Sequence, residues 1–303
     1  MTATHAIGVD LGGTKILAGV VARDGEVIRR HERMTPRDSQ DEVVVELEAA
    51  VAELLDDSVG AIGFGVPSPI DQKRGVVVEC VNLPLSDCPL RESMAKRFGL
   101  PVGLDNDANA AAIGEWRAGA GRGVDDLVML TLGTGLGGGV ISGGRPFRGA
   151  NGGGPELGHV VIVHDGRPCQ GVCRGRGHLE PYVTGTAATA AAREVFGPAA
   201  DAHRLIRLAN EGDEQARSIL HEIGGYLGSG MGSFANVFEP ELIVIGGGFG
   251  VAAWEHLAEA AQAVLEREAL RPMRDEVRVV RAELGTAAGL IGAAFVGFEA
   301  AGG

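Results

Sequence analysis

One pattern occurs twice in the chain: an apolar stretch, a glycine-containing turn and a second apolar stretch. In the first copy, residues 6–21, the turn is Asp10-Leu-Gly-Gly-Thr14, and in the second copy, residues 127–141, it is Thr131-Leu-Gly-Thr-Gly135. A strand pair that is reused some 120 residues later indicates a duplicated lobe rather than a fibrous repeat. Two such lobes facing each other would enclose a cleft.

The chain length and the hydrophobic pattern favour a two-lobed α/β protein. The 303 residues exceed what one hydrophobic core usually organises, and 45% of them are apolar. Strand-like stretches alternate with stretches whose apolar residues recur at three- and four-residue spacing, the helical period. The expected strands are residues 6–9, 16–21, 61–66, 102–104, 127–132, 139–141, 242–245 and 277–281. The expected helices are residues 41–56, 90–97, 107–118, 187–195, 213–238, 252–268 and 286–299.

The charge balance and the cysteine count limit the partners of the protein. Lys and Arg number 27 and Asp and Glu number 40, which gives a net charge of −13. Nucleic acids and anionic membranes need a basic face, so we expect neither as a partner and expect small molecules instead. The four cysteines and a start without a basic and apolar leader predict a cytoplasmic protein. The uncharged run 127–144 is too rich in glycine to form a membrane-spanning helix.

Many of the 49 glycines gather in loops that follow apolar stretches. In the first of these loops, Gly12 and Gly13 can bring backbone N–H groups close to an anion, with Thr14 and Lys15 adding donors, so the loop is a candidate phosphate cradle. An ordinary tight hairpin is the alternative, because the spacing Gly-x-x-x-x-Gly-Lys-Ser/Thr is absent. Asp10 favours the cradle, since a carboxylate beside phosphates needs a divalent cation such as Mg²⁺ between them.

Two further loops add to this interpretation. The loop Gly133–Gly139 is so dense in glycine that its entropic cost is hard to explain by a structural turn alone. Near the C-terminus an apolar strand runs into Gly246, Gly247 and Gly248, the position at which an α/β sheet admits a nucleotide. A tight connection is the alternative for this last loop, but three such loops in one acidic chain favour a nucleotide cleft.

Asn106 and Asp107 end an expected strand and open a helix that runs through Glu115. Asn and Asp are common helix caps, so a capping role is one interpretation. A carboxylate at a strand end inside a cleft can also act as a general base on an alcohol. Asp107 is therefore the candidate base.

A short segment contains two histidines and two cysteines: His159, Cys169, Cys173 and His178. Four such ligands suit a closed tetrahedral zinc site with a structural role. The spacing departs from Cys-x₂-Cys patterns, so unrelated residues remain an alternative, and a disulfide between the two cysteines is disfavoured in the cytosol. Glu156 and Glu180 flank these ligands, so a zinc site would fix two carboxylates that can accept hydrogen bonds from sugar hydroxyls.

Taken in order, the motifs resemble those of the ROK family of sugar kinases. They are Gly8-Val-Asp-Leu-Gly-Gly-Thr-Lys15, Asn106-Asp107, Gly133–Gly139, Glu156-x-x-His159 and the Cys/His segment ending in Glu180. The resemblance runs from residue 8 to about residue 298, and its specificity lies in the combination. It implies a two-lobed α/β fold like that of actin, Hsp70 chaperones and hexokinase, a ribonuclease H-like fold with duplicated β-sheet lobes around a cleft. We expect an N-terminal lobe at residues 1–117, with the C-terminal helix at about 286–303 packed on it, and a C-terminal lobe at residues 118–285 with the zinc-binding segment.

The resemblance also implies roles for individual residues. Asp107 would take the proton from the 6-hydroxyl of a hexose as that oxygen attacks the γ-phosphate of ATP, with Mg²⁺ bound to the nucleotide. The residues expected to hold the sugar are Asn106, Asp107, Glu156, His159 and Glu180. Those expected to hold ATP are Gly8, Asp10, Gly12, Gly13, Thr14, Lys15, Gly133, Thr134, Gly135, Gly137, Gly138, Gly246 and Gly247. Structural Zn²⁺ would be held by His159, Cys169, Cys173 and His178. The family further suggests a homodimer or homotetramer.

The chain departs from the family pattern at two places. The family pattern has a Cys-x-Cys pair followed by a third Cys. In this chain Gly171 and His178 occupy two of those three positions, so Cys169 would substitute for the missing first thiol. Pro155 and Ser68 stand near the expected sugar pocket where the family often has glycine. Glucose is therefore the first expectation, and N-acetylglucosamine, N-acetylmannosamine, mannose and fructose are alternatives.

Two other functions have less support in the sequence. A sugar-responsive transcriptional regulator of the same family would carry a helix-turn-helix ahead of the first phosphate loop, which here begins at Gly8. A kinase that uses polyphosphate would need a basic track for a long polyanion.

Overall fold

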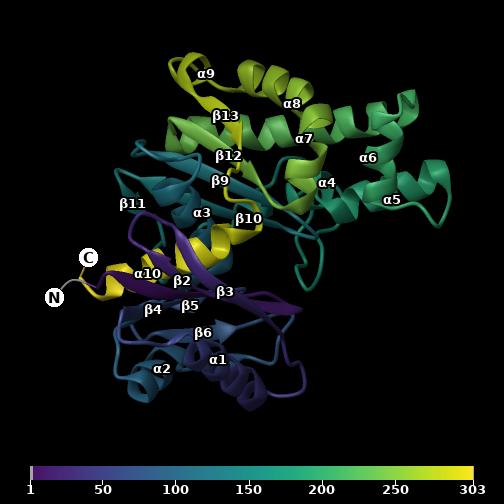
Figure 1. Cartoon of the computed structure of the whole chain (residues 1–303). Helices are drawn as coiled ribbons and strands as arrows, with labels where there is room; N and C mark the ends of the chain where they lie inside the picture. Colours follow the sequence, from purple (N-terminus) through teal and green to yellow (C-terminus); the bar gives the residue numbers. More distant parts are fainter. Residues whose placement is uncertain (1–2, 303) are drawn as a thin grey trace.

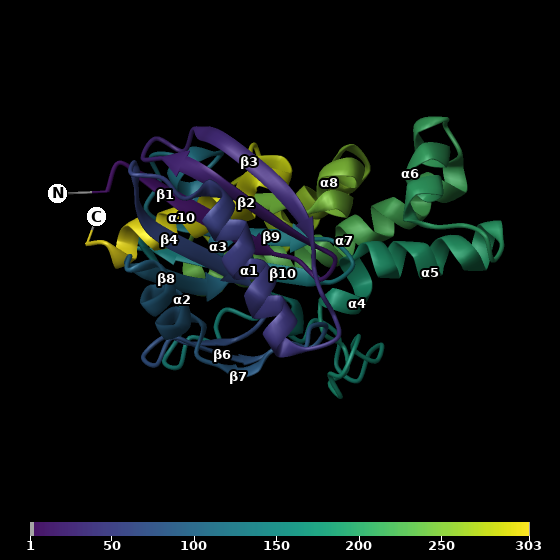
Figure 2. The same cartoon turned by 60° about the horizontal axis from the view of Figure 1, so that its bottom comes forward.

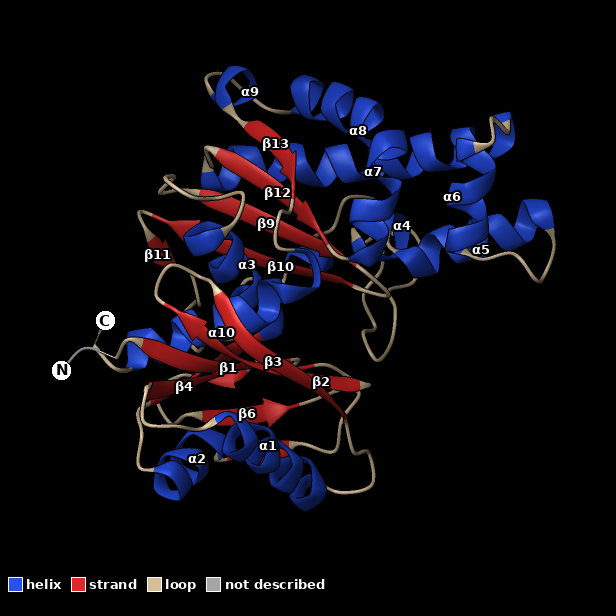
Figure 3. Ribbon diagram, in the orientation of Figure 1, coloured by secondary structure: helices blue, strands red, loops and turns tan. Residues whose placement is uncertain are grey.

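Two five-stranded sheets with the same strand arrangement form the framework of the molecule (Figures 1 and 3). The structure is a computed structural model that describes residues 3–302. The strand order is β3-β2-β1-β4-β8 in the first sheet, here called lobe I, and β11-β10-β9-β12-β13 in the second, lobe II. In each sheet a hairpin pairs antiparallel with a third strand on one side and parallel with two strands on the other. The second lobe repeats the first, which confirms the duplication that the two hairpins predicted.

The strand bounds place both glycine turns at corresponding positions in the two lobes. Lobe I contains β1 (His5–Leu11), β2 (Lys15–Ala22), β3 (Val27–Met34), β4 (Val59–Val66) and β8 (Val102–Asn106). Lobe II contains β9 (Leu127–Leu132), β10 (Leu136–Ser142), β11 (Arg145–Pro146), β12 (Leu242–Gly246) and β13 (Arg278–Arg281). A small antiparallel sheet next to lobe I consists of β5 (Ile70–Asp71), β6 (Val76–Glu79) and β7 (Ser86–Cys88).

Helices cover both faces of each sheet, and one pair lies between the lobes. The helices are α1 (Gln40–Leu54), α2 (Leu90–Phe98), α3 (Asp107–Ala118), α4 (Glu180–Val183), α5 (Gly185–Phe196), α6 (Ala202–Asn210), α7 (Glu214–Phe238), α8 (Gly248–Glu268), α9 (Met273–Glu276) and α10 (Ala288–Ala300), with 3₁₀ turns η1 (Leu157–His159) and η2 (Gly285–Ala287). In Figure 1, α10 (yellow) lies between the two sheets. It packs on β1, β4 and β8 of lobe I, whereas α3 packs on α10 and on β10 of lobe II. Figure 2 shows α5 and α6 extending away from this central pair and both chain ends lying together on the opposite side.

The sequence of α10 explains its central position. Residues 288–298 of this helix carry no charged side chain, and most of them are buried, as expected for a helix with apolar residues on all sides. Glycines allow it to approach its neighbours closely. A Cβ at Gly292 would lie 1.6 Å from the carbonyl oxygen of Ala110 in α3, and one at Gly63 in β4 would lie 1.8 Å from that of Ala293. Helix α10 is thus in backbone-to-backbone contact with lobe I on one side and with α3, which packs on lobe II, on the other.

The elements expected from the sequence are present, and the elements that were not expected are mostly polar or short. Strand β3 carries four charged residues and a histidine in the run Val27–Met34, so it lacks the apolar alternation that marks a strand. Strands β5 to β7 are two to four residues long, and helix α6 is nine residues long. No helix within residues 3–302 is long and apolar enough to cross a membrane.

Two Gly→Ala substitutions, one at the α3–α10 contact and one at a control position in α7, should have opposite effects on stability. Gly292→Ala should lower the free energy of unfolding by about 2 kcal/mol or more, because the added methyl group meets backbone that cannot move aside. Gly225→Ala, in helix α7 with open space around the added methyl, should raise it by about 0.5–1 kcal/mol. Urea unfolding of both variants measures the difference, and equal stability of the two would contradict the packing described.

Candidate active site

A cavity of about 680 Å³ lies between the lobes and is lined by residues of both. Lobe I contributes two carboxylates at strand ends, and lobe II contributes the glycine turn of its hairpin and the start of α8. The lining residues used below are Asp10, Asp107, Met129, Gly133, Thr134, Gly135, Gly137, Glu180, Gly247, Gly248, Val251, Ala252, Ala282, Gly285, Thr286 and Gly289. This cavity corresponds to the cleft that the two hairpins predicted.

Asp107 is held in the cavity by the junction of strand β8 and helix α3. The side chain of Asn106 caps the helix, accepting hydrogen bonds from the N–H groups of Ala108 at 2.9 Å and Asn109 at 3.1 Å. Its amide also donates to Asp107 Oδ1 at 2.9 Å. Desolvation raises the pKa of Asp107, and hydrogen bonds from Ala108 and Asn106 oppose this. The helix cap and the candidate base are therefore neighbouring residues, and the capping role belongs to Asn106.

Asp10, at the end of β1, is the second carboxylate of lobe I in the cavity. Desolvation, and after it the charge of Asp107, raises the pKa of Asp10 to about 7. The side chain of Asp10 packs against Gly289 in α10, where an added Cβ would lie 2.4 Å from Asp10 Oδ2. Two desolvated carboxylates that repel each other form a donor set that suits a hard divalent cation. Asp10 is the residue that could hold Mg²⁺.

The glycine turn of lobe II forms the opposite wall. The turn is closed by a hydrogen bond from Gly133 N to Gly135 O at 2.9 Å, and Leu136 N donates to the carboxylate of Glu180 at 2.9 Å. A Cβ at Gly135 would lie 2.8 Å from that same carboxylate. Glu180 therefore both lines the cavity and fixes the turn, and the turn leaves its backbone open to a ligand.

Not all the expected nucleotide residues line this cavity. Gly133, Thr134, Gly135, Gly137 and Gly247 do. Gly138 faces the packed interior of lobe II, where an added Cβ would meet Leu157. Gly246 lies behind the cavity wall, since an added Cβ there would meet Met129 and Ala282, which line the cavity.

The first hairpin turn, from Gly12 to Lys15, lies outside the lining of the cavity. Arg37 donates to the carbonyl of Gly13, and Thr35 donates to that of Gly12. The ammonium of Lys15 pairs with Glu32 of β3 at 2.7 Å, with both side chains about half exposed.

Gly8 has a packing position rather than a phosphate-binding one. It lies inside β1, paired with Gly19 and Gly63, and a Cβ there would lie 2.0 Å from Leu290 O of α10. The sequence motif that starts at Gly8 therefore combines a contact with α10 and a carboxylate at Asp10.

The expected sugar residues lie next to the cavity. The pKa of Glu156 is raised first by desolvation, lowered by His159, and raised by the charges of Asp107 and Glu180, which places these four groups close together. Glu156 precedes the 3₁₀ turn η1, His159 is its last residue, and Glu180 opens α4. Segments from three parts of the chain thus bring Glu156 and His159 near Asp107 and Glu180, and of these four only Asp107 and Glu180 line the cavity.

Ser68 has a different surrounding from the one expected for a sugar-contacting residue. It is buried, and its hydroxyl donates to Pro69 O at 2.9 Å and accepts from Glu79 N at 3.1 Å. It therefore holds the small sheet together.

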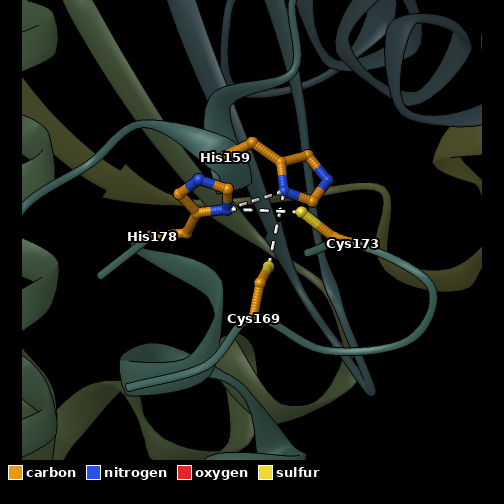
Figure 4. Close-up of side chains that lie close together, drawn as sticks. All are labelled: His159, Cys169, Cys173 and His178. Carbon is orange, nitrogen blue, oxygen red and sulfur yellow. Dashed lines mark hydrogen bonds between the residues drawn. The ribbon is translucent and has the colours of Figure 1, made fainter. Parts of the chain in front are cut away.

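The four expected metal ligands converge in space (Figure 4). His159 Nδ1 and His178 Nδ1 are 3.2 Å apart, Cys169 Sγ is 3.5 Å from His159 Nδ1, and Cys173 Sγ is 3.7 Å from His178 Nδ1. Zinc bonds of about 2.1 Å to nitrogen and 2.3 Å to sulfur put the donors of a tetrahedron about 3.5 Å apart. These residues therefore fit a zinc ion in both kind and spacing.

The backbone near this cluster also suits bound thiolates. Gly175 N donates a hydrogen bond to Cys173 Sγ at 3.4 Å. Desolvation and the neighbouring Cys173 raise the pKa of Cys169 to about 11 in the metal-free protein. Because metals bind the thiolate form of cysteine, binding of a cation would cause Cys169 to lose its proton.

A buried ionic network behind Asp107 was not expected from the sequence. Asp105 is fully buried, and its carboxylate accepts from Arg148 Nε at 2.6 Å and from the amide of Asn109 at 3.1 Å. The same amide donates to Gly154 O, two residues before Glu156, at 3.2 Å. Arg148 also binds Glu299 of α10 through two hydrogen bonds. The run of polar residues 105–109 was the only signal for this network, and it does not name the arginine.

The comparisons with known proteins agree with this geometry. The model of the ROK family matches residues 6–298. The chain belongs to the ROK family.

Its relatives in the ROK family include sugar kinases of more than one specificity. A glucokinase of Streptomyces coelicolor is 34% identical over 95% of this chain and 96% of its own length. An N-acetyl-D-glucosamine kinase of Escherichia coli is 35% identical over 95% of this chain and 98% of its own. The crystal structure of a ROK family glucokinase from Streptomyces griseus in complex with glucose and AMPPNP has a TM-score of 0.82 at 35% identity, with 97% of this chain and 99% of that one covered. The fold is therefore the two-lobed actin- and hexokinase-like fold that the motifs implied.

The raised pKa of Asp10 predicts a pH-dependent loss of stability in the metal-free protein. Below about pH 4 Asp10 is protonated in both the folded and the unfolded chain, so its ionisation does not change the free energy of unfolding. Between that pH and about 7 only the folded chain keeps the proton, so the free energy of unfolding falls by about 1.4 kcal/mol per pH unit. Asp10→Asn should remove this slope, whereas Glu194→Gln, an exposed carboxylate of α5, should keep it. Urea unfolding at pH 5, 6 and 7 measures the slope, and equal slopes in wild type and Asp10→Asn would contradict the assignment.

Proposed function

We propose that this protein transfers the γ-phosphoryl group of ATP to the 6-hydroxyl of a hexose, with glucose as the preferred sugar. The observation that carries the proposal is the meeting of Asp107 with the glycine turn Gly133–Gly137 in one cavity between two lobes. The glucokinase relative and the related structure that contains glucose and AMPPNP support ATP and glucose as the substrates.

Asp107 is the proposed general base. The proton of the 6-hydroxyl passes to its carboxylate, the bond between that oxygen and the γ-phosphorus forms, and the bond from this phosphorus to the bridging oxygen of ADP breaks. Desolvation, which raises the pKa of Asp107, makes the carboxylate a stronger acceptor for this proton. The hydrogen bond from Asn106 fixes its orientation.

The phosphates are proposed to lie against the turn Gly133–Gly137 and the N-terminus of α8. Helix α8 begins at Gly248 after Gly247, and the unpaired N–H groups of a helix N-terminus attract phosphate. Asp10 would hold the Mg²⁺ that accompanies ATP, and this cation supplies charge neutralisation for the phosphates. Met129, Val251 and Ala252 form an apolar part of the cavity that suits the adenosine.

The sugar is proposed to lie among Asn106, Glu156, His159 and Glu180, beside Asp107. Several carboxylates around one site can each accept hydrogen bonds from ring hydroxyls, which would place the 6-hydroxyl at the base. The N-acetylglucosamine kinase relative favours a second candidate, phosphorylation of N-acetylglucosamine in the same cavity.

We propose that His159, Cys169, Cys173 and His178 bind one structural Zn²⁺. The spacing of their donor atoms supports this. His159 lies next to Glu156, and Cys169 lies next to Glu180, so a bound ion would hold the two segments that carry the sugar-binding carboxylates.

From the family resemblance we also propose a homodimer or homotetramer that acts in the cytoplasm. We propose residues 1–117 together with the C-terminal helix, and residues 118–285, as the two units of the enzyme. The packing of α10 on β1, β4 and β8 supports this division.

Replacement of the base tests the proposed reaction. Asp107→Asn keeps the shape of the side chain but cannot accept the proton, so kcat with glucose and ATP should fall by about 10³-fold. The glucose Kd from calorimetry should stay within a few-fold of wild type. Turnover close to that of wild type would show that Asp107 is not the base.

Metal analysis tests the zinc site. The purified protein should contain one zinc per chain, and Cys173→Ser should lower both the zinc content and the affinity for glucose. Cys88→Ser is the matched control, because Cys88 is a buried thiol of the small sheet next to lobe I, remote from the cluster in the chain. A fully active enzyme without zinc would refute the site.

A further inference from the structure

Glu115 has surroundings that neither the expected site nor the proposed reaction explains. It lies near the C-terminal end of α3 and is fully buried, with an exposed fraction of 0%. A buried carboxylate is costly unless it is paired and hydrogen-bonded. The hydrogen-bond partners found for Glu115 within residues 3–302 are backbone N–H groups.

These N–H groups belong to both connections between the lobes. Within residues 3–302 the chain passes from α3 to lobe II through residues 119–126 and returns from β13 to α10 through residues 282–287. Glu115 Oε2 accepts from Ala120 N of the first connection at 2.9 Å. The carboxylate accepts from two residues of the second connection, Glu283 N at 3.1 Å and Leu284 N at 2.8 Å. One side chain thus joins the connection that follows α3 directly to a connection whose residues Glu283 and Leu284 lie 168 and 169 residues beyond Glu115.

The local structure is built around this carboxylate. A Cβ at Gly119 would lie 2.2 Å from Glu115 Oε2, so the glycine leaves room for the charged group. The carbonyl oxygen of Glu115 accepts from Gly119 N and Gly121 N of the same connection. The indole N–H of Trp116 donates to Val124 O at 2.8 Å. The first connection is therefore tied to the end of α3 at four points, and the second is tied to it through the Glu115 carboxylate.

The second connection is also a wall of the cavity. Ala282, Gly285 and Thr286 line it, on either side of the two residues that Glu115 binds. The other walls come from Asp10 and Asp107 in lobe I and from the glycine turn in lobe II. A ligand that touches both lobes binds more tightly when the lobes are closed, so its apparent affinity depends on how often the closed arrangement occurs.

We propose that Glu115 is a positioning residue that clasps the two connections together, so that the lobes rotate about α3 and α10 and close on both substrates. This inference rests on the proposed function, because closure matters through the binding of ATP and sugar. Without the clasp the connections move independently, the lobes gain motions other than closure, and the closed arrangement is less populated. Glu115 itself touches neither substrate in this account.

The test is a comparison of Glu115→Gln with wild type and with Glu241→Gln. The amide is isosteric with the carboxylate, but its NH₂ group faces either Leu284 N or the pair Ala120 N and Glu283 N, so the clasp loses one or two of its three hydrogen bonds. Glu241 is the control, since its carboxylate also accepts two backbone N–H bonds, from Asp125 and Asp126 at the lobe II end of the first connection, but accepts none from the second connection within residues 3–302. For each protein we would measure kcat, KM for glucose, KM for ATP and the urea midpoint.

The clasp predicts a joint change in the two KM values. In Glu115→Gln, KM for glucose and KM for ATP should rise by a similar factor of about ten, with kcat within about threefold of wild type, because a smaller closed population weakens both substrates alike. Glu241→Gln should leave both KM values within about twofold. A lower urea midpoint with both KM values unchanged would reduce Glu115 to a structural cap and overturn the proposal. A rise in KM for ATP alone would overturn it too, since that is the effect of a disturbed nucleotide wall.

Two further measurements keep the test decisive. If Glu115→Gln does not fold, Glu115→Asp is measured by the same criteria, because it keeps the charge but is one methylene too short to reach both connections. Wild-type activity with glucose decides the proposed function by itself. If wild type transfers no phosphate, calorimetric Kd values for glucose and AMPPNP in variant and wild type judge the clasp in place of KM.

Discussion

The contact between α3 and α10 is the constraint on which the cleft depends. Gly292 brings the two helices together until backbone meets backbone at Ala110. Helix α3 carries Asp107 at its first residue and Glu115 near its end, and α10 begins beside Asp10. The candidate base, the candidate magnesium ligand and the two interlobe connections are therefore fixed relative to one pair of helices. A displacement of α10 would move all of them together.

Much of the fold could be predicted because the duplicated hairpins leave few arrangements open. Once β1–β2 and β9–β10 are strand pairs, the alternating pattern after each gives the parallel strands that complete each sheet. The start of β10 was placed at residue 139 but lies at Leu136, since Gly137 and Gly138 pair with β9 without contributing an apolar side chain. Strand β3 was missed for the related reason that its charged residues conceal a strand at the sheet edge. Hydrophobic period reports burial and not backbone pairing.

The site could be predicted where chemistry lies in short motifs. The two histidines and two cysteines are close in sequence, and Asp107 follows a recognisable strand end. These residues could therefore be named from the sequence alone. The sequence did not reveal that Gly8 packs against α10, because a glycine needed for close packing cannot be distinguished by sequence from one needed in a phosphate loop. Glu115 and Arg148 could not be found at all. Their partners lie 168 and 43 residues away, and only the tertiary structure brings them together.

The central claim is that the interlobe cavity phosphorylates a hexose with ATP. Initial rates with ATP and a panel of glucose, mannose, fructose, N-acetylmannosamine and N-acetylglucosamine, giving kcat/KM for each sugar, test it most directly. The account predicts ATP-dependent formation of the sugar 6-phosphate with the highest kcat/KM for glucose. Absence of phosphate transfer to every hexose of the panel, in folded and zinc-containing protein, would contradict it.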